Sequence, residues 1–519
     1  MAYIQSFKEQ SWLLPPRIED LIPEDHVCFL IESLVDALDY SAFDIKYSGV
    51  GHPAYHPRVP LKLLIMGVLD RVRSSRRLAR NARENVVYMY LSEKLSPDFR
   101  TISDFRKDNA ELVKEAFKHT VTLAREEGLL DLSHLSTDGS KIKANAANKR
   151  ILTKDELAVL LGFVEGELEE WAKQDTVEDK QFGELRGYDQ LKDKSKKSVQ
   201  KAAQHYVKQM KEKGDACKSE IESRLKTAQK EVDTSELKKV STTDPESRFM
   251  RNKKGKIELA YNPQLTVDRN GFILANGVCQ DSFDTDQLQP QVLETESNIG
   301  SLPAHVRWSF DAGYYESENI KILSDKTIDG YMYCQEKEED TPYDKKYFLY
   351  DAAKDEYLCP AKGSVLFVGE NYDKGRNKTA RIYKGTQCAL CQVKKECTKS
   401  RTGFRRIKVF PYEKERNAMI AKMGTAEAKE IYKVRQQTVE PVFGDIKGNK
   451  GMTEFLTRGI KSVRSEFNLV CMARNIKRIW TSLRDKAKES NQANGRKSRT
   501  KKKFGQATVK TQFLAFDCR

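Results

Sequence analysis

Nowhere does the sequence hold the roughly 18 consecutive apolar residues that a membrane-spanning helix needs, so we expect no transmembrane segment. A membrane is not among the partners that we expect. The first residues, Met1 to Leu21, lack a basic patch followed by an apolar run, which argues against a secretory signal and for a cytoplasmic protein. Cysteine is sparse, at 10 in 519 residues, and a cytoplasmic location would keep these thiols reduced.

Positive charge, by contrast, is abundant. Lys and Arg number 91 against 76 Asp and Glu, a formal net charge of +15. Such an excess favours a polyanionic partner, because neutralising phosphates releases counterions. It does not distinguish DNA from RNA or from an acidic membrane surface. The length is too great for one ordinary core and predicts about two to four domains.

The patterns of apolar residues divide the chain into segments of different character. Helical spacing dominates residues 1–125, 151–245 and 411–485, whereas strand patterns mark 126–150 and 246–340; residues 341–410 are Cys-rich, and 486–519 form a basic tail. In the tail, 496–503 hold six basic residues in eight, consistent with a disordered solvated tail or with loose DNA contact. Strands alternating with helices predict an α/β fold, a mixed sheet flanked by helices.

Within these segments, some elements can be predicted individually. A short strand should end at Asp138, a hairpin should span 257–279 around a turn at 268–271, and another strand should cover 306–310. Residues 151–245 predict two or three helices, broken near Gly214, that form a projecting hairpin. We expect this segment to be too polar for a sizeable core of its own, and a flexible linker is the alternative.

An arginine-rich stretch follows the apolar helix predicted after Pro60. Six arginines fall within thirteen residues from Arg71 to Arg83, with no acid before Glu84. If this stretch is helical, four of them share one face, because their spacing is i, i+3, i+4 and i+7: Arg73, Arg76, Arg77 and Arg80. The face is suited to DNA-backbone contact, although an ordinary solvated surface is the other interpretation.

Two carboxylates end apolar strands and are followed by small residues. Asp138 stands in Ser-Thr-Asp-Gly-Ser, and Asp311 in Trp-Ser-Phe-Asp-Ala-Gly-Tyr. Carboxylates at strand ends face the crevice where substrates bind in α/β sheets, and Mg²⁺ prefers such oxygens. Gly139 and Gly313 should let a backbone or phosphate approach closely. Asp-Gly is also the commonest turn dipeptide, so two aspartates alone leave a plain turn open.

A third motif strengthens the metal interpretation. Residues 431–447 read Ile-Tyr-Lys-Val-Arg-Gln-Gln-Thr-Val-Glu-Pro-Val-Phe-Gly-Asp-Ile-Lys, which resembles the Tyr-Arg-Glu-Lys signature of insertion-sequence DDE transposases at Tyr432, Arg435, Glu440 and Lys447. Glu440 and Lys447 are seven apart and should share a helix face. The family has three residues between Arg and Glu, and this chain has four, so Arg435 should point away from Glu440. Pro441 predicts a helix start or kink.

Further segments carry the same resemblance over roughly residues 10–485. They are 56–58, 101–106, 242–250, 261–262, 267–268, 443–444, 458–459 and 475–478. The resemblance implies a ribonuclease-H-like core with an all-α N-terminal domain. Asp138, Asp311 and Glu440 would be the catalytic triad and would bind Mg²⁺ or Mn²⁺; Tyr432, Arg435 and Lys447 would contact DNA.

The resemblance also implies double-stranded DNA, the transposon ends and the target, as substrate, a homodimer on that DNA, and association with the bacterial nucleoid. Metal-dependent cleavage and strand transfer would be the reaction. Two alternatives stay open: a ribonuclease-H-like nuclease without strand transfer, and a transposase-derived DNA-binding protein that has lost catalysis.

Four cysteines gather late in the sequence: Cys359, Cys388, Cys391 and Cys397. Cys388 and Cys391 form a CxxC, which is half of a typical structural Zn²⁺ site. The other half is irregular, because Cys359 stands alone. Both a structural zinc and reduced, packed thiols are compatible with the spacing, whereas a redox role lacks the thioredoxin-like pattern.

Overall fold

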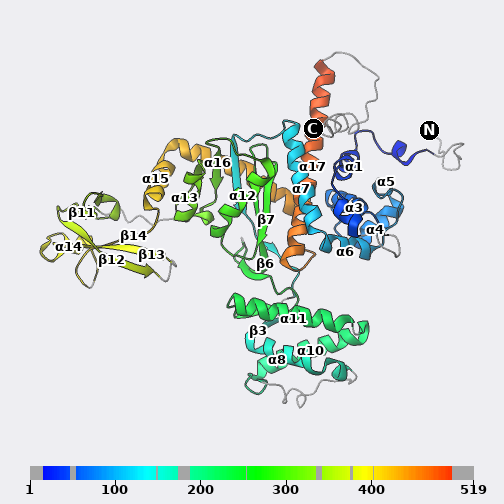
Figure 1. Ribbon diagram of the computed structural model, residues 1–519, viewed down its shortest axis with the longest axis horizontal. Coiled ribbons are helices and arrows are strands. Elements are labelled where there is room, and N and C mark those ends of the chain that lie inside the picture. The colour runs from blue at the N-terminus through cyan, green and yellow to red at the C-terminus, as the bar shows by residue number, and fades with distance from the viewer. Residues whose placement is uncertain are drawn as a thin grey trace, which may run out of the picture.

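The computed structural model describes residues 16–46, 54–147, 150–172, 187–214, 216–252, 254–334, 342–373, 378–400 and 402–493. It is an α/β molecule with a helical N-terminal region, a central mixed sheet, a helical insertion below that sheet and a second sheet at one side (Figure 1). Within the described ranges, none of the helices combines the length and apolarity needed to cross a membrane. The basic cluster at 496–503 lies outside the described residues.

The N-terminal region is helical, as predicted. Its helices are α1 Val27–Asp36, α2 Ser41–Lys46, α3 Arg58–Leu69, α4 Ser75–Glu84, α5 Val86–Leu91, α6 Phe99–Asp108 and α7 Ala110–Glu126. Short side chains start two of them: Asn85 accepts from the Val87 amide at 2.9 Å, and Asp98 accepts from the Arg100 amide at 2.6 Å. Such caps satisfy amides that have no partner inside the helix.

Seven strands build the central sheet: β1 His134–Gly139, β2 Ile142–Lys143, β5 Arg248–Arg251, β6 Ile257–Val267, β7 Ile273–Cys279, β8 Arg307–Phe310 and β9 Asp329–Met332. β7, β6 and β1 are antiparallel neighbours, whereas β1, β8 and β9 run parallel to one another. β2 and β5 also pair with β6. The strands predicted at 138, 257–279 and 306–310 are all present.

The strand β6 is covered on both faces. Its alternate residues Leu259, Tyr261 and Leu265 are buried, but so are Asn262 and Gln264 on the opposite face. A polar strand face is normally solvated; here it is buried and must therefore find hydrogen-bond partners inside the protein.

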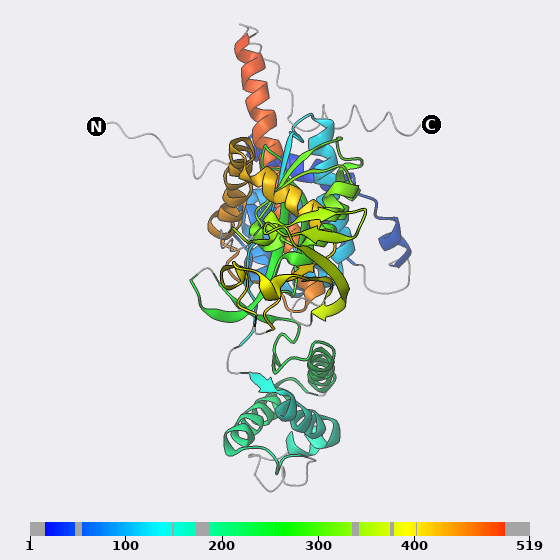
Figure 2. The same cartoon turned by 90° about the vertical axis from the view of Figure 1, so that its left-hand side faces the viewer.

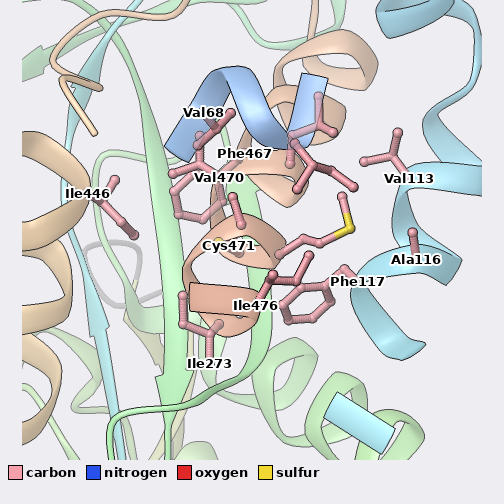
Figure 3. Packing of buried hydrophobic residues seen from close by; sticks show 14 of the residues in the cluster. Val68, Val113, Ala116, Phe117, Ile273, Ile446, Phe467, Val470, Cys471 and Ile476 are labelled. Carbon is pink, nitrogen blue, oxygen red and sulfur yellow. The ribbon is translucent and has the colours of Figure 1, made fainter. Parts of the chain in front are cut away.

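Five helices accompany this sheet: α12 Leu288–Ile299, α13 Ser317–Asp325, α15 Glu413–Gly424, α16 Ala426–Gly444 and α17 Ile460–Ala493. α17 contacts both the N-terminal helices α3 and α7 and the strand β7. Figure 3 shows Phe467, Val470, Cys471 and Ile476 packed among Val68, Val113, Ala116, Phe117 and Ile273. The N-terminal helices and the sheet therefore share one hydrophobic core through α17.

The insertion corrects one expectation. Its described residues form β3 Ile151–Thr153, α8 Lys154–Ala172, α10 Asp193–Lys213, α11 Ala216–Thr234 and β4 Lys239–Ser241, with β3 and β4 paired. The helices and the break after Gly214 were expected, but a separate core was not. Buried side chains from α8, α10 and α11, including Phe163, Tyr206 and Leu225, form their own cluster. The views in Figures 1 and 2 both place this bundle apart from the central sheet, which rules out a plain linker.

The Cys-rich segment forms a five-stranded antiparallel sheet that no strand pattern predicted. Its strands are β10 Leu349–Asp351, β11 Glu356–Leu358, β12 Ser364–Asp373, β13 Lys378–Gly385 and β14 Arg406–Val409, in sequence order. Many of its strand residues are exposed, above all in β10 and β12. Its small core consists of Phe348, Val365, Tyr383 and Ile407. The short helix α14 Lys394–Cys397 lies between β13 and β14.

Candidate active site

Two neighbouring strands carry the two predicted aspartates to the same edge of the sheet. Asp138 is near the end of β1, and Asp311 directly follows β8. These strands are parallel, and Thr137 pairs with Phe310, the residue before Asp311. Because parallel strands in this register end together, the two carboxylates lie beside each other.

Glu440 lies on the helix α16, which packs across one face of β1. Thr438 donates a hydrogen bond to the Ser136 hydroxyl at 2.8 Å and thereby holds the helix against the strand. Both groups are buried, so the contact also satisfies two hydroxyls that solvent cannot reach. It fixes how far Glu440 stands from the ends of β1 and β8.

A single guanidinium lies among the three carboxylates. One nitrogen of Arg435, Nη2, is 3.3 Å from Asp138 Oδ1 and 3.0 Å from Asp311 Oδ1, while Nη1 is 3.7 Å from Glu440 Oε1. Because one nitrogen contacts both aspartate oxygens, the Asp138 and Asp311 carboxylates are close neighbours. The structure brings together three acids from distant parts of the chain around one cation.

The position of Arg435 corrects the expectation that it points away from Glu440. Its side chain is only 7% exposed and turns toward the carboxylates, because they supply the charge that a buried guanidinium requires. The expected helix start at Pro441 is also wrong. α16 continues through Pro441 and ends at Gly444, after which the chain widens into a π turn, Asp445–Asn449.

Burial separates the three acids electrostatically. The Asp138 side chain is 13% exposed, against 45% for Asp311 and 50% for Glu440. Burial raises the pKa of Asp138 to about 6, with Arg435 acting in the opposite direction and Asp311 adding to the rise. Burial would lower the pKa of Arg435, yet the neighbouring carboxylates raise it overall. Asp138 is thus the carboxylate that most requires a nearby cation.

The remaining signature residues also lie at this site. Lys447 donates to the Ser140 hydroxyl at 2.7 Å and to the Lys141 carbonyl at 3.0 Å, just after Asp138. It does so from the π turn rather than from a regular helical face shared with Glu440. Tyr432 meets the Tyr333 ring edge-on at 4.7 Å, and burial raises its pKa to about 12. Its half-buried ring also lies 6.0 Å from the Arg435 guanidinium carbon.

The donor chemistry of the triad suits a divalent cation. Three carboxylates that share one positive group are the type of oxygen ligand that Mg²⁺ and Mn²⁺ prefer. In the described part of the chain, however, no group of three or more His, Cys, Asp or Glu side chains is arranged to hold a metal ion as it stands. The place between the acids is taken by Arg435, whose Nε is buried without a hydrogen-bond partner. The charge fits a metal ion, and the guanidinium has to move to admit one.

Two family models of transposases match parts of the chain. A family model described as a transposase DDE domain matches residues 358–480, and one described as a transposase domain (DUF772) matches residues 16–108. The chain is similar to DDE transposases. The first match contains Arg435 and Glu440, and the second contains the arginine-rich stretch; neither includes Asp138 or Asp311. Among curated proteins no match is found.

In this transposase-like chain the arginine face differs from the expectation. α4 begins only at Ser75, because Arg71 adopts a φ of 60° that breaks the helical path. Arg73 therefore lies outside the helix and points inward, 2.7 Å from Glu466 of α17 and 2.7 Å from the Glu454 carbonyl. The prediction that Arg73 shares a helix face with the other three arginines is therefore wrong. Arg76, Arg77 and Arg80 are on α4 and exposed.

The four clustered cysteines of the transposase-like chain are all free and partly exposed. Burial raises the pKa of Cys397, Arg405 acts against that rise, and Cys359, Cys388 and Cys391 contribute to it, so the four thiols lie in one neighbourhood. They are not arranged as a metal site in the described residues. Both the structural zinc and the reduced, packed thiols therefore stay predictions.

One carboxylate near the triad was missed. Asp284, in the turn between β7 and α12, is buried beside Gly139 and Gly313. The space that these glycines were expected to leave for a phosphate is filled by this side chain. The only sequence signal was a short acidic run at 281–286 after a strand, and such runs are usually solvated turns.

Proposed function

We propose that this chain is a DNA transposase whose Asp138, Asp311 and Glu440 bind divalent cations, Mg²⁺ or Mn²⁺, and catalyse cleavage and strand transfer at insertion-sequence ends. The observation that carries the proposal is the meeting of these three acids around the Arg435 guanidinium. Structural ion pairs seldom gather three carboxylates on one cation, because each additional acid repels the others.

The strand order supports a ribonuclease-H-like core. Three antiparallel strands, β7, β6 and β1, are followed by two parallel ones, β8 and β9, with α12 between β7 and β8. The two aspartates lie at adjacent parallel strand ends and the glutamate on a helix covering one face. Such a frame holds catalytic acids on rigid elements rather than on long loops.

The proposed reaction has two in-line displacements. Water attacks the phosphorus at a transposon end; the bond to the 3′ oxygen breaks, leaving a 3′-OH and a 5′-phosphate. That 3′-OH then attacks another phosphodiester, forming one P–O bond as another breaks. Bound divalent cations would activate the attacking oxygen and stabilise the leaving one.

The chain's own residues position the reactants. Asp138 and Asp311 are held by paired strands, and Glu440 by the Thr438–Ser136 contact. Once Arg435 leaves the carboxylates, its planar fork can take a phosphate, for which it is well shaped. Lys447, beside the end of β1, and Tyr432, beside Arg435, complete the proposed DNA contacts.

Asp138→Asn, Asp311→Asn and Glu440→Gln test the proposal, because each removes charge at nearly constant shape. Each should abolish Mg²⁺-dependent cleavage of an end-containing duplex while duplex binding is retained. Glu427→Gln, exposed on the same helix as Glu440, is the matched control and should cleave normally. Cleavage by any of the three would remove that residue from the triad. Cleavage without joining of the 3′-OH to target DNA would instead indicate a nuclease.

A further inference from the structure

A buried carboxylate outside the triad lies on the opposite face of the central sheet from Arg435. The Asp284 side chain is 11% exposed. Its Oδ1 accepts from Asn262 Nδ2 and from Gln264 Nε2, each at 2.7 Å. A buried carboxylate is costly unless it is hydrogen-bonded, and here the polar face of β6 supplies both donors.

This carboxylate touches the backbone next to both catalytic aspartates. A Cβ placed on Gly139, the residue after Asp138, would lie 2.5 Å from Asp284 Oδ1 and 2.5 Å from Gln264 Nε2. A Cβ on Gly313, two residues after Asp311, would lie 3.1 Å from Asp284 Oδ2. A Cβ at Gly139 would displace Asp284 or Gln264, and one at Gly313 would push Asp284 by a few tenths of an ångström, because contacts this short are repulsive.

Further hydrogen bonds tie the loop after Asp311 to the same carboxylate. The buried Tyr314 hydroxyl donates to Gln264 Oε1, so Gln264 joins Tyr314 to Asp284. Asn319 donates to the Thr285 carbonyl at 2.6 Å and to the Tyr314 carbonyl at 2.8 Å. The turn that carries Asp284 and the loop that follows Asp311 are therefore one connected unit.

The loop after Asp138 is connected as well. The Ser140 amide donates to the Pro263 carbonyl at 2.9 Å, which keeps this loop against β6 beside Asn262 and Gln264. Lys141 Nζ lies 3.7 Å from Asp284 Oδ2, and the Lys141 carbonyl accepts from Lys447.

We propose that Asp284 is a positioning residue: it fixes the backbones after Asp138 and Asp311 and thereby sets the spacing of the two carboxylates for divalent cations. The inference rests on the proposed function, because it concerns the same triad. Residues that orient metal ligands without touching the ion typically change metal affinity about 10–100-fold when replaced. Asp284 lies on the face of the sheet that carries Gly139 and Gln264, whereas Asp138 and Arg435 lie on the opposite face.

Mn²⁺ binding to the full chain, measured by electron paramagnetic resonance without DNA, tests this role. Asp284→Ala removes the acceptor and should weaken Mn²⁺ binding about 10–100-fold. Asp284→Asn keeps the shape and one oxygen acceptor, so it should remain within about threefold of the parent, a rescue expected of hydrogen-bonded positioning. Asp286→Ala, exposed on the same turn, is the control and should bind normally. Duplex binding should be unchanged in all three.

Parent-like Mn²⁺ affinity in folded Asp284→Ala would overturn the inference, as would an equal loss in Asp286→Ala. If Asp284→Ala does not fold, Tyr314→Phe serves instead, because it deletes only the hydroxyl that holds Gln264. That variant should bind Mn²⁺ several-fold more weakly, and unchanged binding would equally overturn the proposal. Failure of the proposed function looks different: Mn²⁺ binding would then be insensitive to Asp138→Asn and Asp311→Asn themselves.

Discussion

Replacing Arg435 with glutamine should destabilise the metal-free protein and make its stability depend on divalent cations. The substitution leaves three carboxylates near one another with no cation between them. Removing one partner of a buried ion pair typically costs about 3–5 kcal/mol. Only Asp138 is well buried here, while Asp311 and Glu440 are 45% and 50% exposed, so their pairs contribute about 0–1 kcal/mol each after solvent screening.

At neutral pH we therefore expect the free energy of unfolding to fall by about 2–3 kcal/mol. This is less than the full cost of an unpaired buried charge, because the variant no longer buries a guanidinium. At an unfolding entropy of about 2.1 cal/mol/K per residue, each kcal/mol lowers the melting temperature of a body of roughly 300 residues or more by only about 1–2 °C. Added Mg²⁺ should recover more stability in Arg435→Gln than in the parent, because the ion no longer competes with a resident cation. An ion present at 100 times its dissociation constant stabilises by about 2.7 kcal/mol.

Thermal melts in EDTA and in a series of Mg²⁺ concentrations measure both effects. Arg435→Lys, which keeps the charge, should fall between the parent and the glutamine variant. Lys433→Gln, exposed on the same helix, should melt like the parent. A parent-like melting temperature of Arg435→Gln in EDTA, or an identical response of both proteins to Mg²⁺, would refute the idea that the guanidinium occupies the ion's place.

Three further outcomes are expected. Replacing the exposed α4 arginines 76, 77 and 80 with Gln should weaken duplex binding and flatten its salt dependence by up to about 0.9 log unit per phosphate contact, and an unchanged slope in a salt titration would mean a merely solvated face. Joining the chain across a deletion of 155–240 with a Gly-Ser linker should leave Mn²⁺ binding intact, because the insertion has its own core, but should abolish paired-end cleavage; normal transposition would deny the insertion a mechanistic role. Burial lowers the pKa of His134 to about 4, below its unfolded value near 6.5, so the neutral ring stabilises the fold above pH 6.5 and this stabilisation is lost as the pH falls toward 4. In urea unfolding, the free energy of unfolding should fall by about 2–3 kcal/mol between pH 7 and 4.5, and His134→Gln should remove most of that pH dependence. Equal losses in both proteins would exclude this histidine.

The sequence was most informative where a local pattern determines the structure. The apolar runs before Asp138 and Asp311 predicted strands that end at these acids, and helical spacing predicted the helices on either side of the Gly214 break. These features need only neighbouring residues, which a periodic pattern describes well.

The contacts that it could not predict join distant segments. Arg73 was assigned to a helical face because its spacing fits, but the backbone at Arg71 and the partner Glu466 decide its direction. The core of the insertion was underestimated because each helix has only a narrow apolar stripe, and three stripes together form a core. Asp284 stands in a short acidic run after β7, and no local pattern shows that Asn262 and Gln264 donate to it.

The single long helix α17 has a consequence for how the protein is made. The first helices bury Val113 and Phe117 against side chains that come from 460–480, and Arg73 pairs with Glu466. At about 5–20 residues per second, these partners leave the ribosome tens of seconds after the N-terminal helices. Until then the early helices expose the apolar faces that α17 will cover, so a chain truncated before residue 460 should aggregate or be degraded rather than persist as a free folded fragment.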